Sequence, residues 1–307
     1  MDRFHQIQVY VAVAEEQGFA AAARRLQLSP PAVTRAVAAL EETLGVKLLN
    51  RTTRYVRATE AGQRYLEDAR QILARLASAD EAAAGINAEP RGHLAVTAPV
   101  LFGRKFVMPG VVDYLQRYPG MEVNAVFLDR VVNLLEEGMD VSVRIGDLPD
   151  SSMRALRVGT VRSVVVAAPE YLARCGIPQV PQDLLAHSII ASSAGSFSAG
   201  WRFASGTGDH PLRVKPRLTV TTNDAAITAA CEGLGITRLL SYQVAEEVEK
   251  RRLEVLLQEF EPPPHPVHIV HREGPYSSTK VRAFIDLLAT RLRGEKALAY
   301  NTAQRRD

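Results

Sequence analysis

Apolar residues recur at helical spacing from the start of the chain. They stand at Phe4, Ile7, Val11 and Ala14, a pattern that predicts a helix from Phe4 to about Glu16. Gly18 interrupts this pattern. The alanine-rich segment 19–26 that follows predicts a second helix, whose small residues allow close packing against a neighbour.

A third helix is predicted over residues 30–44, after a tight turn. Ser29 is a candidate N-cap, and Pro30 takes the first helical position, where its missing N–H costs nothing. Gly45 ends this helix. The inward stripe consists of Val33, Val37, Leu40 and Leu44. Two short helices joined in this way predict a helix-turn-helix, whose second helix enters the DNA major groove by its N-terminal residues.

The outward positions at the start of the third helix are therefore candidate DNA contacts. They are Pro30, Pro31, Thr34 and Arg35. An arginine can make paired hydrogen bonds to guanine, whereas threonine and proline can contact phosphate or a thymine methyl group.

Residues 46–50 and 54–58 have the pattern of two short strands that form a hairpin, or wing. Arg51 and Arg54 on this wing suit phosphate or minor-groove contacts, which position a protein on DNA. We expect residues 1–58 to form a winged helix-turn-helix domain. The alternative is that 18–57 is a basic three-helix unit used only for packing.

The positive charge of the chain is concentrated in this region. Seven basic and two acidic residues lie between Gln17 and Arg57, a net charge of +5, whereas the whole chain carries +3. A basic patch ahead of a nearly neutral remainder is typical of a DNA-binding module attached to another domain.

One long helix is predicted after the wing, from Thr59 to about Ile86, because the segment contains no proline. Thr59 is its expected N-cap, and at about 1.5 Å per residue the helix is roughly 40 Å long. Its apolar stripe is formed by Tyr65, Leu66, Ala69, Ile72, Leu73, Leu76, Ala79 and Ala83. Such a narrow stripe needs a partner helix, so residues 59–88 are interpreted as a linker that pairs two subunits; packing on the chain's own body is the alternative. A hinge is predicted at 87–92.

Strand and helix patterns alternate in the second half, which predicts an α/β domain over residues 89–300. We expect two lobes with a cleft between them, lobe 1 over about 92–161 and 267–300 and lobe 2 over about 162–266. Strands are predicted near 93–99, 121–127, 140–145, 161–168, 188–191, 214–221, 235–240 and 266–271. Helices are predicted near 108–118, 131–137, 223–232, 241–250 and 278–293.

Three strand ends are candidate effector contacts, because ligands of open α/β folds bind beyond the carboxyl ends of strands and near helix N-termini. Arg144 at such a cleft would pair with an anionic ligand; an ion pair with Asp140 or Asp147 is an equal alternative. Thr222 and Asn223 could instead simply cap the following helix. Ser192 and Trp201 are further candidates for the wall of lobe 2. The candidate effector residues are Ala98, Pro99, Val100, Arg144, Gly146, Ser193, Thr222 and Asn223.

Motifs of enzyme chemistry are weak, and we expect no catalytic residue, cofactor or metal. On a strand, His268 would point away from His265 and His271, which disfavours a metal site. The segment 195–200, GSFSAG, misses the nucleophile-elbow spacing, and no phosphate-binding GxxxxGK[ST] occurs. Cys175 and Cys231 are distant in sequence, and they would form a redox switch only if the fold brought them together.

Neither a run of apolar residues long enough to span a membrane nor a signal-peptide pattern is present, so a cytoplasmic location is expected.

The segment 19–62 resembles the LysR-type transcriptional regulators. The matching motifs are AAxxL, LSxPAVTR, AxxxLExxLGVxLLxRTTR and the closing TEAG. The resemblance implies that Ser29, Pro31, Thr34 and Arg35 contact DNA, with Arg51, Thr52 and Arg54 on the DNA backbone and the wing. Pro30 and Thr34 depart from the residues that the family often carries there, a glutamine or other polar residue and a serine.

The second half is similar to the periplasmic-binding-protein-like effector domain of the same family, notably in HLAVTAPVLFGRK, DVSVRIGDLPDSS and TTNDAAITAACEGLGIT. The resemblance implies a regulator that binds double-stranded operator DNA and a small-molecule effector. The strand ends around Arg144 suggest that this effector is anionic or aromatic, and the stripe of the linker helix predicts a dimer or tetramer; RNA polymerase is a further candidate partner. Two alternatives stay open: a solute-binding or enzymatic α/β protein whose N-terminal helices only dimerise, and an architectural DNA-binding protein without an effector.

Overall fold

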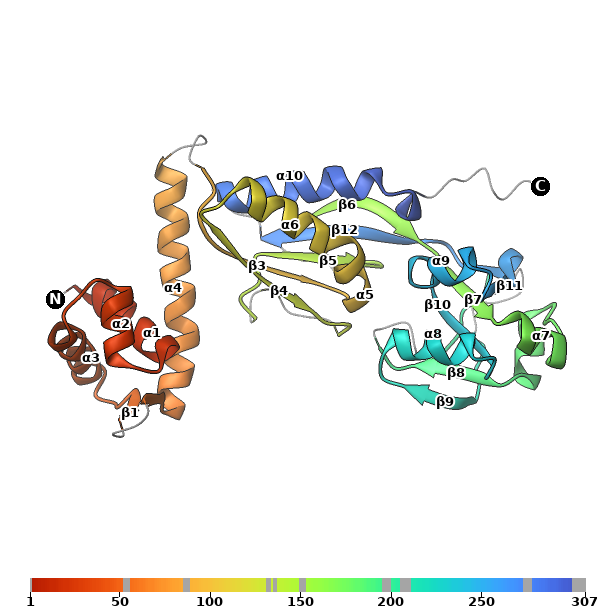
Figure 1. Cartoon of the computed structure of the whole chain (residues 1–307), viewed down its shortest axis with the longest axis horizontal. Coiled ribbons are helices and arrows are strands. Elements are labelled where there is room, and N and C mark those ends of the chain that lie inside the picture. The colour runs from red at the N-terminus through yellow and green to blue at the C-terminus, as the bar shows by residue number, and fades with distance from the viewer. Residues whose placement is uncertain are drawn as a thin grey trace. The chain divides into compact units, whose positions relative to one another are not determined.

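The computed structural model divides the chain into two compact units, Met1–Ala88 and Glu89–Asp307 (Figure 1). The residues that the structure describes are 2–51, 56–84, 89–130, 134, 137–148, 153–194, 200–204, 211–272 and 278–299.

The first unit is a helix-turn-helix with a two-stranded wing and a long helix. Its elements are α1 (Arg3–Glu16), α2 (Phe19–Arg25), α3 (Pro30–Leu44), β1 (Leu49–Arg51), β2 (Val56–Ala58) and α4 (Glu60–Ala84). The strands are antiparallel, with Leu49 opposite Ala58. The predicted helices are confirmed, and the strands are shorter than predicted.

The two ends of helix α3 are set by residues whose backbone preferences suit a helix start and a helix stop. Pro30 is its first residue, and Gly45 adopts the left-handed conformation that stops it, with φ of 66°. The predicted side-chain cap is wrong: Ser29 stands at the N-cap, but its hydroxyl caps no backbone N–H. Instead the Ser29 carbonyl accepts the backbone N–H groups of Ala32 and Val33.

The core of the first unit lies among α1, α3 and the first turns of α4. Val33, Val37 and Leu40 are fully buried as predicted, and Leu44 packs at the edge of this core. Phe4, at the start of α1, is 41% exposed, because the buried face of the helix is centred on Val9, Tyr10 and Val13.

The apolar stripe of α4 divides into two parts. Leu66 and Ala69 are buried in the core of the first unit, so this part packs on the chain's own body. Ile72 and Leu76 are 42% and 37% exposed.

The second unit contains two mixed sheets. Its strands are β3 (Gly92–Ala98), β4 (Met121–Phe127), β5 (Val141–Ile145), β6 (Met153–Val161), β7 (Ser163–Ala167), β8 (Ile189–Ser192), β9 (Pro216–Val220), β10 (Ile236–Leu240), β11 (Glu254–Leu256) and β12 (His265–Arg272). Its helices are α5 (Val100–Phe102), a π-helical segment (Gly103–Val107), α6 (Met108–Arg117), α7 (Pro169–Cys175), α8 (Asn223–Cys231), α9 (Ser241–Glu249) and α10 (Thr279–Gly294), with 3₁₀ turns at Pro181–Ala186, Gln258–Phe260 and Lys296–Leu298.

Each lobe is built on one five-stranded sheet. Lobe 1 has the strand order β4-β3-β5-β12-β6, and lobe 2 has the order β11-β7-β10-β8-β9. In lobe 1 the neighbours β4, β3 and β5 pair in parallel, and in lobe 2 the neighbours β10, β8 and β9 do so. The remaining neighbour pairs of each sheet are antiparallel. Helices α6 and α10 lie along one side of the lobe 1 sheet (Figure 1).

The chain passes between the lobes twice, from β6 into β7 and from β11 back into β12. The prediction lacked β6, α7 and β11. The helix predicted over 131–137 falls mostly outside the described residues; Leu134 and Glu137 lie in turns.

Candidate functional site

The N-terminal end of α3 presents one exposed surface. Ser29, Pro30, Pro31, Thr34 and Arg35 are all exposed. The opposite face of the helix is buried in the core described above. The structure therefore brings together the five predicted positions at the start of the recognition helix.

Two of these side chains are partly held by their own helix. The Thr34 hydroxyl donates to the Pro30 carbonyl at 3.1 Å, and Arg35 Nε donates to the Pro31 carbonyl at 3.4 Å. The second contact uses only Nε, so the terminal nitrogens of the guanidinium remain for the two parallel bonds that guanine accepts.

Glu41 fixes the start of the wing to the recognition helix, a role that the sequence reasoning missed. This residue is only 3% exposed, and its Oε1 accepts the backbone N–H groups of Leu48 at 2.9 Å and Leu49 at 3.1 Å. Its Oε2 lies 2.9 Å from Lys47 Nζ. Burial opposes ionisation, but the hydrogen bonds from Lys47, Leu49 and Leu48 outweigh it and hold the pKa of Glu41 below its usual value.

The first turn of α4 is joined to the same place. The Thr59 hydroxyl accepts from Gly62 N at 2.9 Å, as predicted for an N-cap, and donates to the Lys47 carbonyl at 2.8 Å. Gly62 is required by close approach, because an added Cβ would lie 2.0 Å from the Leu48 carbonyl oxygen. The wing residues Thr52 and Arg54 lie outside the described residues, as does the side chain of Arg51.

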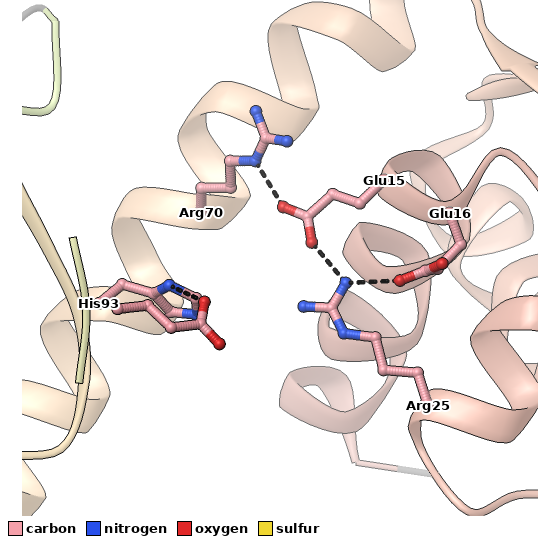
Figure 2. Close-up of polar contacts among 6 residues, drawn as sticks. Glu15, Glu16, Arg25, Arg70 and His93 are labelled. Atoms are coloured by element: carbon pink, nitrogen blue, oxygen red, sulfur yellow. Dashed lines mark hydrogen bonds and ion pairs between the residues drawn. The ribbon is translucent and has the colours of Figure 1, made fainter. Parts of the chain in front are cut away.

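Part of the predicted basic patch is neutralised by ion pairs. Figure 2 shows Glu15 between Arg25 and Arg70, at 2.8 and 2.9 Å, with Glu16 also 3.3 Å from Arg25. Burial opposes the charge of Glu15, but the hydrogen bonds from Arg25 and Arg70 lower its pKa below the usual value. Glu15 of α1 therefore joins α2 and α4 through Arg25 and Arg70, and the paired Arg25 adds little positive potential to the surface.

The second unit contains a pocket of about 120 Å³ that both lobes line. Of the predicted effector residues, the structure brings together Pro99 and Arg144 of lobe 1 and Asn223 of lobe 2. Ser192 and Trp201, also considered from the sequence, line it too.

The other predicted effector residues lie near the pocket without being part of its lining. Ala98 is buried within β3, and Val100 N donates to Asp129 Oδ1 at 3.0 Å. Gly146 turns the chain after β5 with φ of 103°. The Ser193 hydroxyl donates to the Val220 carbonyl, and the Thr222 hydroxyl bonds the Asp224 carboxylate rather than capping the backbone of α8.

Arg144 shares its surroundings with Arg130 and Glu137. Arg130 forms two hydrogen bonds with the Glu137 carboxylate, at 2.6 and 2.7 Å. Burial lowers the pKa of Arg144; the charge of Glu137 opposes this shift, and Arg130 adds to it. Glu137 thus places a negative charge near Arg144, and the predicted alternative of an ion pair with Asp140 or Asp147 stays a prediction.

Several pocket residues were missed from the sequence, and Arg238 and Tyr242 are the most informative of them. Arg238 is the single charged residue in the strand ITRLL of β10, and this interruption of an apolar strand was the available signal. Tyr242 lies in the first turn of α9 but belongs to the core of lobe 1, where its ring lies 5.3 Å from that of Phe102 and 5.8 Å from that of Phe106. This aromatic cluster joins the lobes at one end of the pocket.

The residues weighed for enzyme or redox chemistry are spread over the second unit, as far as the structure describes them. No group of His, Cys, Asp and Glu that could hold a metal ion occurs among the described residues. His265 Nε2 bonds the Ser163 hydroxyl at 3.0 Å, and most of the GSFSAG segment lies outside the described residues. Both cysteines are free, and burial beside Glu247 raises the pKa of the Cys231 thiol, which disfavours a reactive thiolate. In the described part of the chain no helix is long and apolar enough to cross a membrane.

Two family models match the chain. Residues 4–63 match the bacterial regulatory helix-turn-helix protein model of the lysR family, and residues 87–293 match the LysR substrate binding domain. Among curated relatives, the chain is 30% identical to the HTH-type transcriptional regulator CrgA of Neisseria meningitidis serogroup B over 288 residues, 94% of this chain and 96% of CrgA. It is 32% identical to the HTH-type transcriptional activator AaeR of Escherichia coli over 290 residues, 94% of this chain and 93% of AaeR.

Solved structures agree with this assignment. The structure of CrgA matches with a TM-score of 0.61 at 30% identity, covering 95% of this chain and 99% of that one. The full-length virulence activator AphB of Vibrio cholerae matches with a TM-score of 0.62 at 25% identity, covering 94% and 99%. Both units of the chain are therefore accounted for by one family, and the protein belongs to the LysR-type transcriptional regulators, with a helix-turn-helix DNA-binding domain and an effector-binding domain.

Proposed function

We propose that this regulator reads its operator with the exposed surface at the start of α3. The observation that carries the proposal is the joint exposure of Ser29, Pro30, Pro31, Thr34 and Arg35 on a helix whose other face is buried. Arg35 contacts a guanine edge and supplies specificity. Arg51, Thr52 and Arg54 contact the DNA backbone and supply affinity without sequence preference.

A small-molecule effector binds in the pocket between the lobes, with Pro99, Arg144 and Asn223 among its contacts. Support comes from the polar and charged groups that both lobes bring to one concave site. If the ligand binds one arrangement of the lobes more tightly than the other by about 1–3 kcal/mol, it can change the affinity of the protein for its operator by a measurable amount.

The protein acts as a dimer or tetramer in the cytoplasm, where its operator and RNA polymerase are found. The exposed side chains of Ile72 and Leu76 on α4 are the surface that a second subunit covers. Two subunits would place two recognition helices on two half-sites of an operator. No catalytic step is part of this function.

Footprinting on the DNA upstream of the protein's own gene, with and without metabolite extracts, tests the proposal. Arg35→Ala should cost about 1–3 kcal/mol at the protected site and leave binding to random DNA nearly unchanged. Arg51→Ala should weaken binding to all DNA and reduce its salt dependence. Arg117→Ala, an exposed arginine on α6 in the second unit, is the control of equal charge change.

Equal losses on operator and random DNA for Arg35→Ala would refute its role as a base reader. A footprint that no metabolite extract alters would count against the effector. Loss of the footprint in excess random competitor would favour an architectural DNA-binding protein.

A further inference from the structure

A guanidinium in the lobe 2 wall of the pocket has no carboxylate paired with it among the residues that the structure describes. Arg238 lies in the middle of β10 between the buried residues Thr237 and Leu239, and it lines the pocket. Its Nη1 atom is buried and has no hydrogen-bond partner in the described part of the chain. The Phe203 ring lies 5.8 Å from the guanidinium carbon, a cation–π contact that satisfies no N–H donor. Burial lowers the pKa of Arg238 to about 10, so the group is still a cation at neutral pH.

The other charged groups of the pocket are engaged within the protein. Arg130 is paired with Glu137, and Asp129 accepts the backbone N–H of Val100. Arg144 lies beside the same Glu137. Asp129 is the carboxylate of the pocket lining, but it belongs to lobe 1, and no carboxylate of the described residues shifts the pKa of Arg238, which burial alone lowers.

His265 lies near Arg238 but does not change the net charge around it. Its Nε2 bonds the Ser163 hydroxyl at 3.0 Å. Burial lowers the pKa of His265, and the positive charge of Arg238 lowers it further; the charge of Asp147 opposes this shift without reversing it, so the imidazole is neutral at pH 7. A neutral ring adds no charge that would balance Arg238 within the described part of the chain.

Burying a charge without a partner is costly, because the low dielectric of the interior replaces the solvation that water gave. A protein keeps such a charge without a counter-ion where a ligand supplies one on binding. An oxyanion is the natural partner, since it accepts charge-assisted hydrogen bonds from a guanidinium.

The dimensions and walls of the pocket restrict the rest of the ligand. A volume of about 120 Å³ holds on the order of ten water-sized positions, which suits a molecule of about ten non-hydrogen atoms. Apolar and aromatic side chains, among them Ile190, Trp201 and Leu239, form much of the lobe 2 side.

We propose that Arg238 is the anion-binding residue of this pocket and that the ligand is a small organic acid with an apolar body. Its carboxylate pairs with the guanidinium, and its apolar part packs against Ile190 and Trp201. This inference rests on the proposed function, in that it names the chemical class of the effector.

Benzoate and its neutral counterpart benzamide are the probes, and their affinities for the full-length protein are measured by calorimetry. The wild type should bind benzoate at least about tenfold more tightly than benzamide, because a hydrogen bond to a charged group contributes that much. Arg238→Met should bind the two probes alike. Arg217→Met, which removes an exposed arginine from β9 of the same lobe, should keep the wild-type preference.

A second readout requires no ligand. Arg238→Met should unfold at the same or a higher temperature than the wild type, because it removes an uncompensated buried charge. Arg238→Gln, a second neutral variant, should lose the preference for benzoate in the same way.

The proposal is overturned if the wild type does not prefer benzoate, or if both neutral variants keep the preference. A clear loss of stability in Arg238→Met would also overturn it, since that result would mean a protein group already satisfies the charge. None of these measurements involves DNA. A negative result would therefore overturn the role of Arg238 and leave the proposed operator recognition by Arg35 unaffected.

Discussion

Replacing Glu41 tests how the wing is held against the recognition helix. In Glu41→Ala the backbone N–H groups of Leu48 and Leu49 lose their shared acceptor, and the two residues are only 1% and 3% exposed, so water cannot replace it. Each unsatisfied buried donor costs about 1–3 kcal/mol, so the two together give a loss of about 2–6 kcal/mol in the free energy of unfolding. The ion pair with Lys47 adds less than about 1 kcal/mol, because the Lys47 side chain is 77% exposed.

Hydrogen exchange at the Leu48 and Leu49 amides in the full-length protein measures this effect directly. Glu41→Ala should speed exchange of both amides by a factor of roughly thirty or more, and Lys47→Ala should have little effect. Glu41→Gln keeps an acceptor oxygen and should cost about 1 kcal/mol. Equal exchange in Glu41→Ala and Lys47→Ala would refute the reasoning, because it would mean that the surface ion pair and not the buried acceptor holds the wing.

The same carboxylate gives a pH dependence of known sign. The pKa of Glu41 is lower in the folded protein than its usual value. Its contribution to stability is therefore complete above the usual carboxyl pKa and is lost as the pH falls through the lowered folded pKa. The stability difference between the wild type and Glu41→Gln should accordingly be constant near neutral pH and shrink on acidification; a difference that grows in acid would contradict this.

Three further outcomes follow from the packing. Gly62→Ala should lower the stability of the first unit by about 1–3 kcal/mol or more in thermal unfolding, because the new methyl overlaps the Leu48 carbonyl, whereas Gly294→Ala, with open space around it, should be neutral. Ile72→Asp should release smaller species in sedimentation while the helical circular dichroism is kept, since Ile72 is exposed in the single chain; an unchanged oligomer would place the interface elsewhere. Arg144→Ala should abolish the response of operator binding to an identified effector, and a wild-type response would make Arg144 structural.

Most of the fold could be predicted from the sequence because its determinants are local. Pro30 and Gly45 set the ends of α3 through their own backbone preferences, and Thr59 caps α4 through a hydroxyl three residues from its partner. Alternating strand and helix patterns likewise indicated the α/β architecture of the second unit. The missed β6 has exposed and buried residues in irregular order, including a β-bulge opposite β12, so it lacks the alternation that marks a strand.

The sequence by itself determined the surface at the start of α3, since helical periodicity alone separates Thr34 and Arg35 from the buried Val33 and Val37. Only the tertiary structure decided which strand ends meet in one pocket, because that depends on the two crossings between lobes. It also decided that Leu66 belongs to the core of its own unit, and that Glu41 is a buried acceptor. Arg238 shows most clearly why the sequence alone does not settle such points. A charge in an apolar strand is visible in the sequence, but whether it is compensated depends on groups that approach it from distant segments.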